Sequence, residues 1–156
     1  MKKLILIIIA IILVIVAGYI LFKAKPIDKS PKQNEILTTH YSGENASTSI
    51  IVDSITPGDV ISSPLNITGK AKGWYFEGSF PVSLVDGDGL IIANGIAQAK
   101  GDWMTSEFIP FEAKIVFTKP ANSNAFGDRG SLILKKDNPS GMTTYDASIE
   151  IPIKFK

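Results

Sequence analysis

The stretch YDASIEIPIKFK, residues 145–156, carries the clearest fold signal in the chain. Apolar or small side chains alternate strictly with polar residues and one proline over its whole length. A period of two sends successive side chains to opposite faces of an extended chain, so the stretch predicts a long, half-buried strand and not a helix. Pro152 cannot donate to a strand ladder, so we expect this strand at a sheet edge or this peptide facing solvent.

The same alternation recurs upstream in LNITGKAK, residues 65–72. Turn residues such as Pro57-Gly58-Asp59 and Asn138-Pro139-Ser140-Gly141 separate further apolar segments. About seven short strands and no convincing helix predict an all-β, immunoglobulin-like antiparallel β-sandwich. The expected strands are 49–55, 65–71, 80–86, 90–100, 108–117, 130–137 and 145–155.

Cysteine is absent from the 156 residues. This composition excludes disulfide scaffolds, thiolate metal sites and thiol nucleophiles. It also excludes the cysteine pair of antibody domains, so the core of the predicted sandwich must rest on apolar packing alone. A domain of this size buries enough surface to fold without a disulfide.

The N-terminal segment LILIIIAIILVIVAGYILF, residues 4–22, contains no charged side chain. As a helix it would extend roughly 28 Å, close to the thickness of a bilayer core, so it predicts one N-terminal transmembrane helix. A cleaved signal peptide is the alternative, but its apolar region is usually shorter and no clear cleavage site follows. The predicted organisation is therefore a membrane anchor at 1–25, a flexible linker at 26–48 and the β-sandwich at 49–156.

Charge is divided unevenly along the chain. Residues 1–25 hold four of the 16 cationic side chains and none of the 15 acidic ones, so residues 26–156 carry 12 cationic against 15 acidic side chains. The mildly acidic folded part lacks the basic stripe that a nucleic-acid binder needs, which predicts no nucleic-acid partner. The cationic side chains beside the apolar segment do not decide the topology by themselves. We expect a single-pass protein of the cell membrane with its C-terminal domain outside.

Five segments, in order, resemble the immunoglobulin-like domain of bacterial spore germination proteins. They are SPLNITGKA at 63–71, FEGSFPV at 76–82, WMT at 103–105, DNPSG at 137–141 and IPIKF at 151–155. The resemblance covers about residues 50–156. It implies a bacterial, extracytoplasmic module that mediates interactions and does not catalyse a reaction. It carries over no catalytic, metal-binding or cofactor-binding residue.

The inventory of reactive side chains also favours a protein that is not an enzyme. The single histidine, His40, falls in the predicted linker, which excludes a Ser-His-Asp triad or a histidine metal cluster in the folded domain. Asp86-Gly87-Asp88-Gly89 is typical of a hairpin turn and lacks the later ligands of a calcium loop. A carboxylate pair for envelope glycan hydrolysis stays open as an alternative. Its candidates are Asp86, Asp88, Asp102, Glu107, Asp128 and Asp137.

The strongest candidate for a binding patch is aromatic. It consists of Trp74, Tyr75, Phe76, Trp103 and Met104. Such side chains supply rigid contact area and stack on sugar rings or on partner side chains. The alternative is that Trp74, Phe76 and Trp103 fill the core of the sandwich. The partners we expect are the lipid bilayer, through residues 4–22, and an envelope protein or the cell-wall glycan (peptidoglycan).

Overall fold

The computed structural model describes residues 39–43, 45–120 and 127–156. The predicted membrane span at 4–22 lies outside these ranges. Among the residues that are described, no helix has the length and apolar character needed to cross a membrane. The prediction of a membrane anchor therefore rests on the amino-acid sequence alone.

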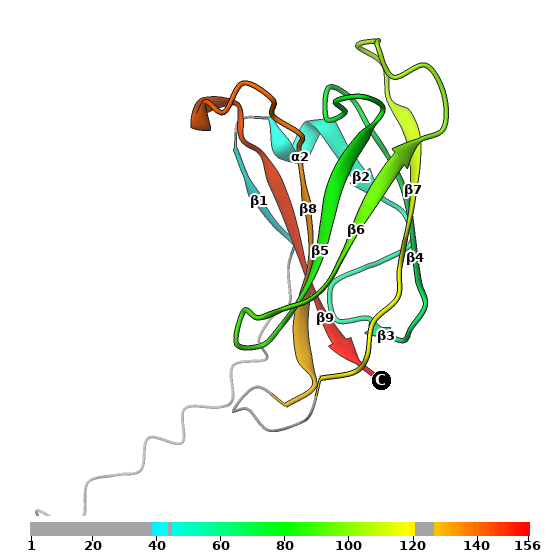
Figure 1. Cartoon of the computed structure of the whole chain (residues 1–156), viewed down its shortest axis with the longest axis vertical. Coiled ribbons are helices and arrows are strands. Elements are labelled where there is room, and N and C mark those ends of the chain that lie inside the picture. The colour runs from blue at the N-terminus through cyan, green and yellow to red at the C-terminus, as the bar shows by residue number, and fades with distance from the viewer. Residues whose placement is uncertain (1–38, 44, 121–126) are drawn as a thin grey trace, which may run out of the picture. The chain divides into compact units, whose positions relative to one another are not determined.

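All seven expected strands are present, and two short strands join them (Figure 1). The expected strands are β2 (Ile50–Val52), β4 (Leu65–Ala71), β5 (Ser79–Asp86), β6 (Ile91–Ala99), β7 (Ile109–Ile115), β8 (Arg129–Lys135) and β9 (Ser148–Phe155). The additional ones are β1 (His40–Ser42) and β3 (Val60–Ile61). A four-residue helix, α2 (Ala46–Ser49), and a 3-10 turn, η1 (Thr143–Tyr145), complete the described elements.

The nine strands form one curled sheet, in which eight follow the order β1-β9-β8-β5-β6-β7-β4-β2 and β3 adds to β9. The link between β6 and β7 consists of only two residue pairs, Gln98 with Glu112 and Ala99 with Phe111. The sheet folds back on itself there, so that an arm of β2, β4 and β7 faces an arm of β6, β5, β8 and β9. The all-β prediction is confirmed, and the curled sheet fits an immunoglobulin-like fold.

One pairing departs from the antiparallel expectation. The strand β3 pairs with β9 in parallel, Val60 beside Lys154 and Ile61 beside Phe155. The preceding strand β2 pairs antiparallel with β4 in the other arm. The chain therefore changes arms between residues 52 and 60, because the breaker sequence there ends β2 and lets the next residues add to β9 instead.

The core lies between the two arms and follows the period-two pattern. Buried and exposed residues alternate along β4, and every second residue of β9 is buried. Phe80 on β5 is fully buried and packs edge-on against Phe111 of β7, with ring centroids 5.0 Å apart. Apolar side chains from both arms thus meet without any disulfide.

Pro152 lies where β9 has no strand partner on one side. The strand β1 pairs with residues 148–150 of β9, and β3 pairs with residues 154–155. In the gap between them, the carbonyl of Pro152 accepts a hydrogen bond of 2.8 Å from the N–H of Gly58. The N–H and C=O of a strand residue point to the same side. The position at which Pro152 lacks an N–H therefore faces this gap and not β8.

The fold begins earlier than residue 49. The strand β1 pairs with β9 through His40, Tyr41 and Ser42, and Ala46 of α2 is buried in the core. Residues 40–43 and 45–48, which the sequence assigned to the linker, therefore pack against the sandwich. Their short, polar sequence gives no periodic signal, so only the tertiary contacts identify them as part of the fold.

Candidate functional site

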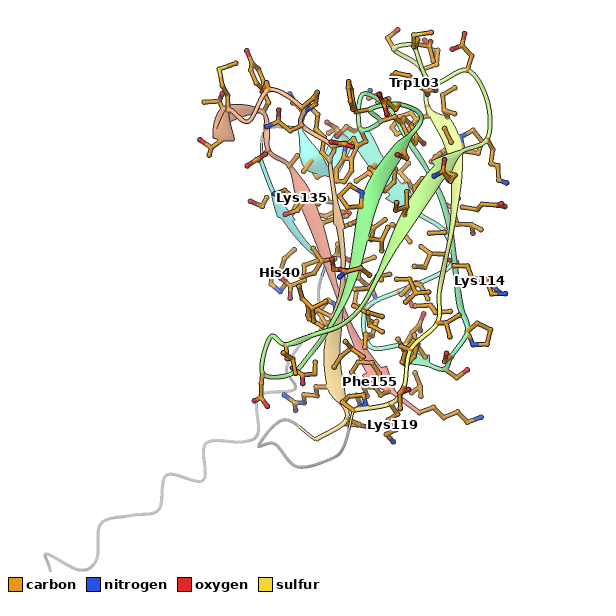
Figure 2. The ribbon with its side chains drawn as sticks, viewed as in Figure 1. His40, Trp103, Lys114, Lys119, Lys135 and Phe155 are labelled. Carbon is orange, nitrogen blue, oxygen red and sulfur yellow. The ribbon has the colours of Figure 1, made fainter. Side chains whose placement is uncertain are left out.

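Three loops lie together at one end of the sandwich, which we call the loop end. They are the β4–β5 loop (72–78), the β6–β7 loop (100–108) and the β8–β9 loop (136–147). The strand register puts them there, because Ala71 pairs with Ile109, Ser79 with Gln98 and Lys135 with Ser148. Figure 2 shows Trp103 at this end and Phe155 at the opposite one. All five residues of the predicted aromatic patch lie on the first two loops.

Trp74 is a core residue. Its side chain is 1% exposed, and its ring meets Phe80 edge-on at 5.7 Å. The indole N–H donates a 2.8 Å hydrogen bond to the hydroxyl of Ser49 at the end of α2. Its polar group is hydrogen-bonded inside the protein, so Trp74 holds α2 against the core and offers no surface to a ligand.

Tyr75 is also buried, with 9% of its surface exposed. Its hydroxyl donates a 2.6 Å hydrogen bond to the carbonyl of Ile109, at the start of β7. Burial removes water from the phenol and raises the pKa of Tyr75 to about 12, although a hydrogen bond with the backbone of Ala71 opposes the rise. Tyr75 therefore stays protonated at neutral pH and holds the two arms together.

A tight turn separates these two buried residues from β5. The N–H groups and carbonyls of Phe76 and Ser79 bond to each other at 3.0 and 3.1 Å. The intervening Glu77 and Gly78 both have positive φ, 50° and 75°, as a two-residue hairpin turn requires. The turn directs Phe76 outward, and its side chain is 41% exposed. Phe76 therefore does not fill the core, which was the alternative that the sequence left open for it.

The β6–β7 loop folds over this turn. Trp103 is partly exposed and lies against Gly78, where a Cβ would come within 3.3 Å of its ring. Met104 follows it and is 76% exposed, with its N–H bound to the carboxylate of Asp102 at 3.1 Å. The patch that remains available on the surface is therefore Phe76, Trp103 and Met104, which we call the end patch.

The candidate carboxylates are divided between the two ends of the fold. Asp86, Asp88 and Asp128 belong to the end opposite the loop end, whereas Asp102, Glu107 and Asp137 belong to the loop end. One carboxylate oxygen of Asp86 accepts hydrogen bonds from the N–H groups of Asp88 and Leu90, at 3.0 and 2.9 Å. The Asp-Gly-Asp-Gly sequence thus forms the predicted hairpin turn, with a carboxylate used to close it.

Groups of three or more residues that could hold a metal ion are absent from the described part of the chain. His40 lies on β1, where its side chain is exposed. It pairs through its backbone with Glu150 of β9. The position of His40 is therefore that of an edge-strand residue.

Two exposed side chains of the loop end were not singled out from the sequence. Met142 and Tyr145, on the β8–β9 loop, are each 54% exposed. The alternating pattern had placed Tyr145 inside the last strand, but that strand begins at Ser148 and Tyr145 closes the turn η1. The only available signal was the Asn-Pro-Ser-Gly sequence just before them, which marks the loop but not its length.

The comparisons with known proteins give one match. A family model described as the immunoglobulin-like domain of bacterial spore germination matches residues 49–142, more than half of the chain. Four of the five resembling segments lie inside this match, and the fifth, at 151–155, lies beyond it. Neither the curated proteins nor the solved structures include a match. With the all-β fold described above, the match shows that this chain belongs to the family of immunoglobulin-like domains of bacterial spore germination.

Proposed function

We propose that this chain is a single-pass protein of a bacterial cell membrane that displays its immunoglobulin-like domain outside the cell as a non-catalytic binding module. The family match supports an extracellular-type module without chemistry of its own. The uncharged segment at 4–22 supports the membrane anchor.

The end patch carries the binding role. Met104 is 76% exposed on the β6–β7 loop and follows Trp103, whose partly exposed ring lies against Gly78 in the turn that exposes Phe76. Large apolar side chains gathered on loops cost free energy in water and are enriched where proteins bind one another. Methionine adapts its shape to different partners because its side chain is unbranched and flexible. We therefore propose an envelope protein with an exposed apolar surface as the partner.

Cell-wall glycan is the second candidate ligand, because the exposed rings of Phe76 and Trp103 could stack on sugars. Retention of the domain on purified peptidoglycan separates the two candidates. Binding that is lost in Trp103→Ala would identify the glycan as the ligand. If the domain stays in the supernatant, the glycan is excluded and the protein partner stands.

Photo-crosslinking in living cells tests the protein partner. A photoreactive amino acid in place of Met104 should yield a crosslinked product. The same amino acid in place of Leu90, which is 65% exposed at the opposite end, should yield none. Equal crosslinking at both positions, or none at Met104, would contradict binding through the end patch.

The topology is tested by adding protease to intact spheroplasts. We expect the linker to be cut from outside, which releases the domain, while a cytoplasmic control protein stays intact. A domain that is protected until the membrane is lysed would refute the external location.

A further inference from the structure

The strands β4 and β7 carry an exposed face on which cations gather. Every second residue of each strand is exposed, and the register aligns these residues in pairs. The pairs are Lys70 with Pro110, Thr68 with Glu112 and Asn66 with Lys114. On the other side of β7, the end of β6 adds Ile96, Gln98 and Lys100. We call this surface, with the adjoining Lys72 and Phe108, the lysine face, and Figure 2 shows Lys114 pointing outward from it.

Two cations of the lysine face gather at one aromatic ring. The Nζ atom of Lys72 lies 4.9 Å from the ring centroid of Phe108, and that of Lys70 lies 5.8 Å from it. Neither ammonium group forms an ion pair within the described residues. Each is attracted to the ring, but the two repel each other. A bound anion would offset this repulsion, so the position suits a negatively charged group.

The carboxylate of Glu112 offsets only the charge of Lys100, with which it forms an ion pair. No other residue of the lysine face is acidic. Lys114 follows Glu112 by two residues on β7 and has no ion pair in the part of the chain that the structure describes. Three ammonium groups, those of Lys70, Lys72 and Lys114, are therefore available to a negatively charged ligand.

A cleft of about 370 Å³ lies on the lysine face, within the size range of small-molecule sites. Its exposed lining residues are Asn66 and Thr68 of β4, Glu112 and Lys114 of β7, and Ile96 and Gln98 of β6. Among the described residues, the side chains of Asn66, Thr68 and Gln98 have no hydrogen-bond partner. Amide and hydroxyl groups both donate and accept hydrogen bonds, as the hydroxyl groups of a sugar do. The cleft therefore suits a ligand that is rich in hydroxyl groups.

We propose that the lysine face binds an acidic saccharide. Its hydroxyl groups occupy the cleft, and its carboxylate or phosphate lies between the ammonium groups of Lys70 and Lys72. Lys70 follows Thr68 by two residues on the same face, about 7 Å along the strand, so one ligand reaches both parts of the site. A neutral sugar would leave the ammonium groups unpaired, and a simple anion would leave the cleft unfilled. The site does not include the end patch, and the proposal does not depend on the proposed function.

Isothermal titration calorimetry of the fragment 36–156 tests the ligand class, since this compact unit contains the whole described core. The probes are a galacturonate oligosaccharide and a phosphorylated oligomannoside. We expect at least one of them to bind, with an affinity that falls as the salt concentration rises. Its uncharged form, the methyl ester or the dephosphorylated oligosaccharide, should bind at least about tenfold more weakly. The probe that binds identifies carboxylate or phosphate as the anion. Binding of neither probe, or equal binding of the uncharged forms, would overturn the proposal.

A pair of charge-removing substitutions tests the place of the anion. Lys70→Gln combined with Lys72→Gln should weaken binding at least about tenfold, because two charge-assisted contacts are lost. Lys119→Gln combined with Lys135→Gln is the matched control, because it removes the same charge from exposed lysines outside the lysine face. The control should leave the affinity unchanged. Equal weakening in both double variants would show attraction by net charge and would overturn the site.

The role of the cleft is tested with Gln98→Leu, which removes an amide and keeps a similar volume. Saccharide binding should weaken several-fold. Trp103→Ala, which alters the end patch, should leave it unchanged, so this result is separate from the test of the proposed function. A single-stranded DNA oligonucleotide of equal charge should bind more weakly than the saccharide, because it offers fewer hydroxyl groups to the cleft. Equal affinity for the oligonucleotide, or unchanged saccharide binding in Gln98→Leu, would overturn recognition of a saccharide.

Discussion

Single hydrogen bonds from aromatic side chains connect parts of this chain that are distant in sequence. The indole of Trp74 reaches Ser49, and the phenol of Tyr75 reaches Ile109 across the two arms. Both rings also contact Phe80. A buried aromatic residue of this kind contributes to stability through packing. Its hydrogen bond also fixes the orientation of the ring, because only one orientation satisfies the donor.

Replacing Tyr75 by phenylalanine should lower the free energy of unfolding by about 1 kcal/mol, because the carbonyl of Ile109 loses its donor. Urea denaturation measures the change. Tyr145→Phe is the control, because its ring is 54% exposed and no stability loss is expected. An equal loss in both variants would show that the buried hydrogen bond is not the cause.

The raised pKa of Tyr75 predicts that the free energy of unfolding depends on pH. The folded pKa of Tyr75 is raised from 10.0 to about 12, so the unfolded chain releases its phenol proton at a lower pH than the folded protein does. The contribution to stability is complete below pH 10 and is lost as the pH rises toward 12. The unfolding free energy of Tyr75→Phe should therefore fall less steeply over this interval. Parallel curves for the two proteins would contradict the raised pKa.

At the scale of elements, the hairpin turn at residues 76–79 positions the end patch. It exposes Phe76, starts β5 and provides the flat backbone surface on which Trp103 lies. Glu77 adopts φ of +50°, a left-handed conformation that costs most side chains about 1 kcal/mol. The turn therefore retains a residue that local energetics disfavour.

Glu77→Asn should raise the free energy of unfolding by roughly 0.5–1 kcal/mol, because Asn-Gly is the preferred pair in a two-residue hairpin turn with positive φ. Thermal or urea denaturation measures the gain. Glu107→Asn makes the same chemical change on the β6–β7 loop at a residue without positive φ, so no gain is expected there. A gain in both variants would point to removal of charge and not to backbone conformation.

At the scale of the whole molecule, β1 and α2 complete the sandwich at the N-terminal side of the domain. The strand β1 pairs with β9, Ala46 is 2% exposed, and Ser49 accepts the Trp74 hydrogen bond. These contacts lie at residues that precede the family match, which begins at residue 49, or at its first position. The folded unit is thus longer on this side than the region by which the family is recognised.

A fragment of residues 50–156 should therefore be less stable than one of residues 36–156, by about 2–4 kcal/mol from the lost burial and hydrogen bonds. Urea denaturation of the two fragments measures the difference. Ser49→Ala in the longer fragment removes the hydroxyl that accepts the bond from Trp74 and donates to the carbonyls of Asn45 and Ala46, and it should cost about 1 kcal/mol. Equal stability of the two fragments would show that β1 and α2 are dispensable.

The periodic parts of the fold could be predicted because a strand with one buried face alternates apolar and polar residues in its sequence. The strands β4 and β9 alternate strictly, and all seven strands expected from the pattern exist. The strands β1 and β3 have three and two residues, too few for a period to be visible. Their existence depends on the unpaired edge of β9, which no local pattern describes.

The candidate site was only partly predictable, because composition does not show whether a side chain points into the core or to the surface. The sequence gathers aromatic residues at 74–76 and 103, and the structure places them all at one end. It buries Trp74 and Tyr75 and exposes Phe76 and Met104. The turn at Glu77 and Gly78 decides this, since its positive φ angles redirect the chain within two residues.

The sequence by itself determined the all-β class, the positions of the seven main strands, the absence of disulfide chemistry and the uncharged segment at 4–22. These features follow from period, composition and charge, which are properties of short windows of chain. Only the tertiary structure decided which aromatic residues reach the surface and that residues 40–43 and 45–49 belong to the fold. Those outcomes depend on pairing between segments 38 to 110 residues apart, and that pairing is set by the collective burial of a shared core.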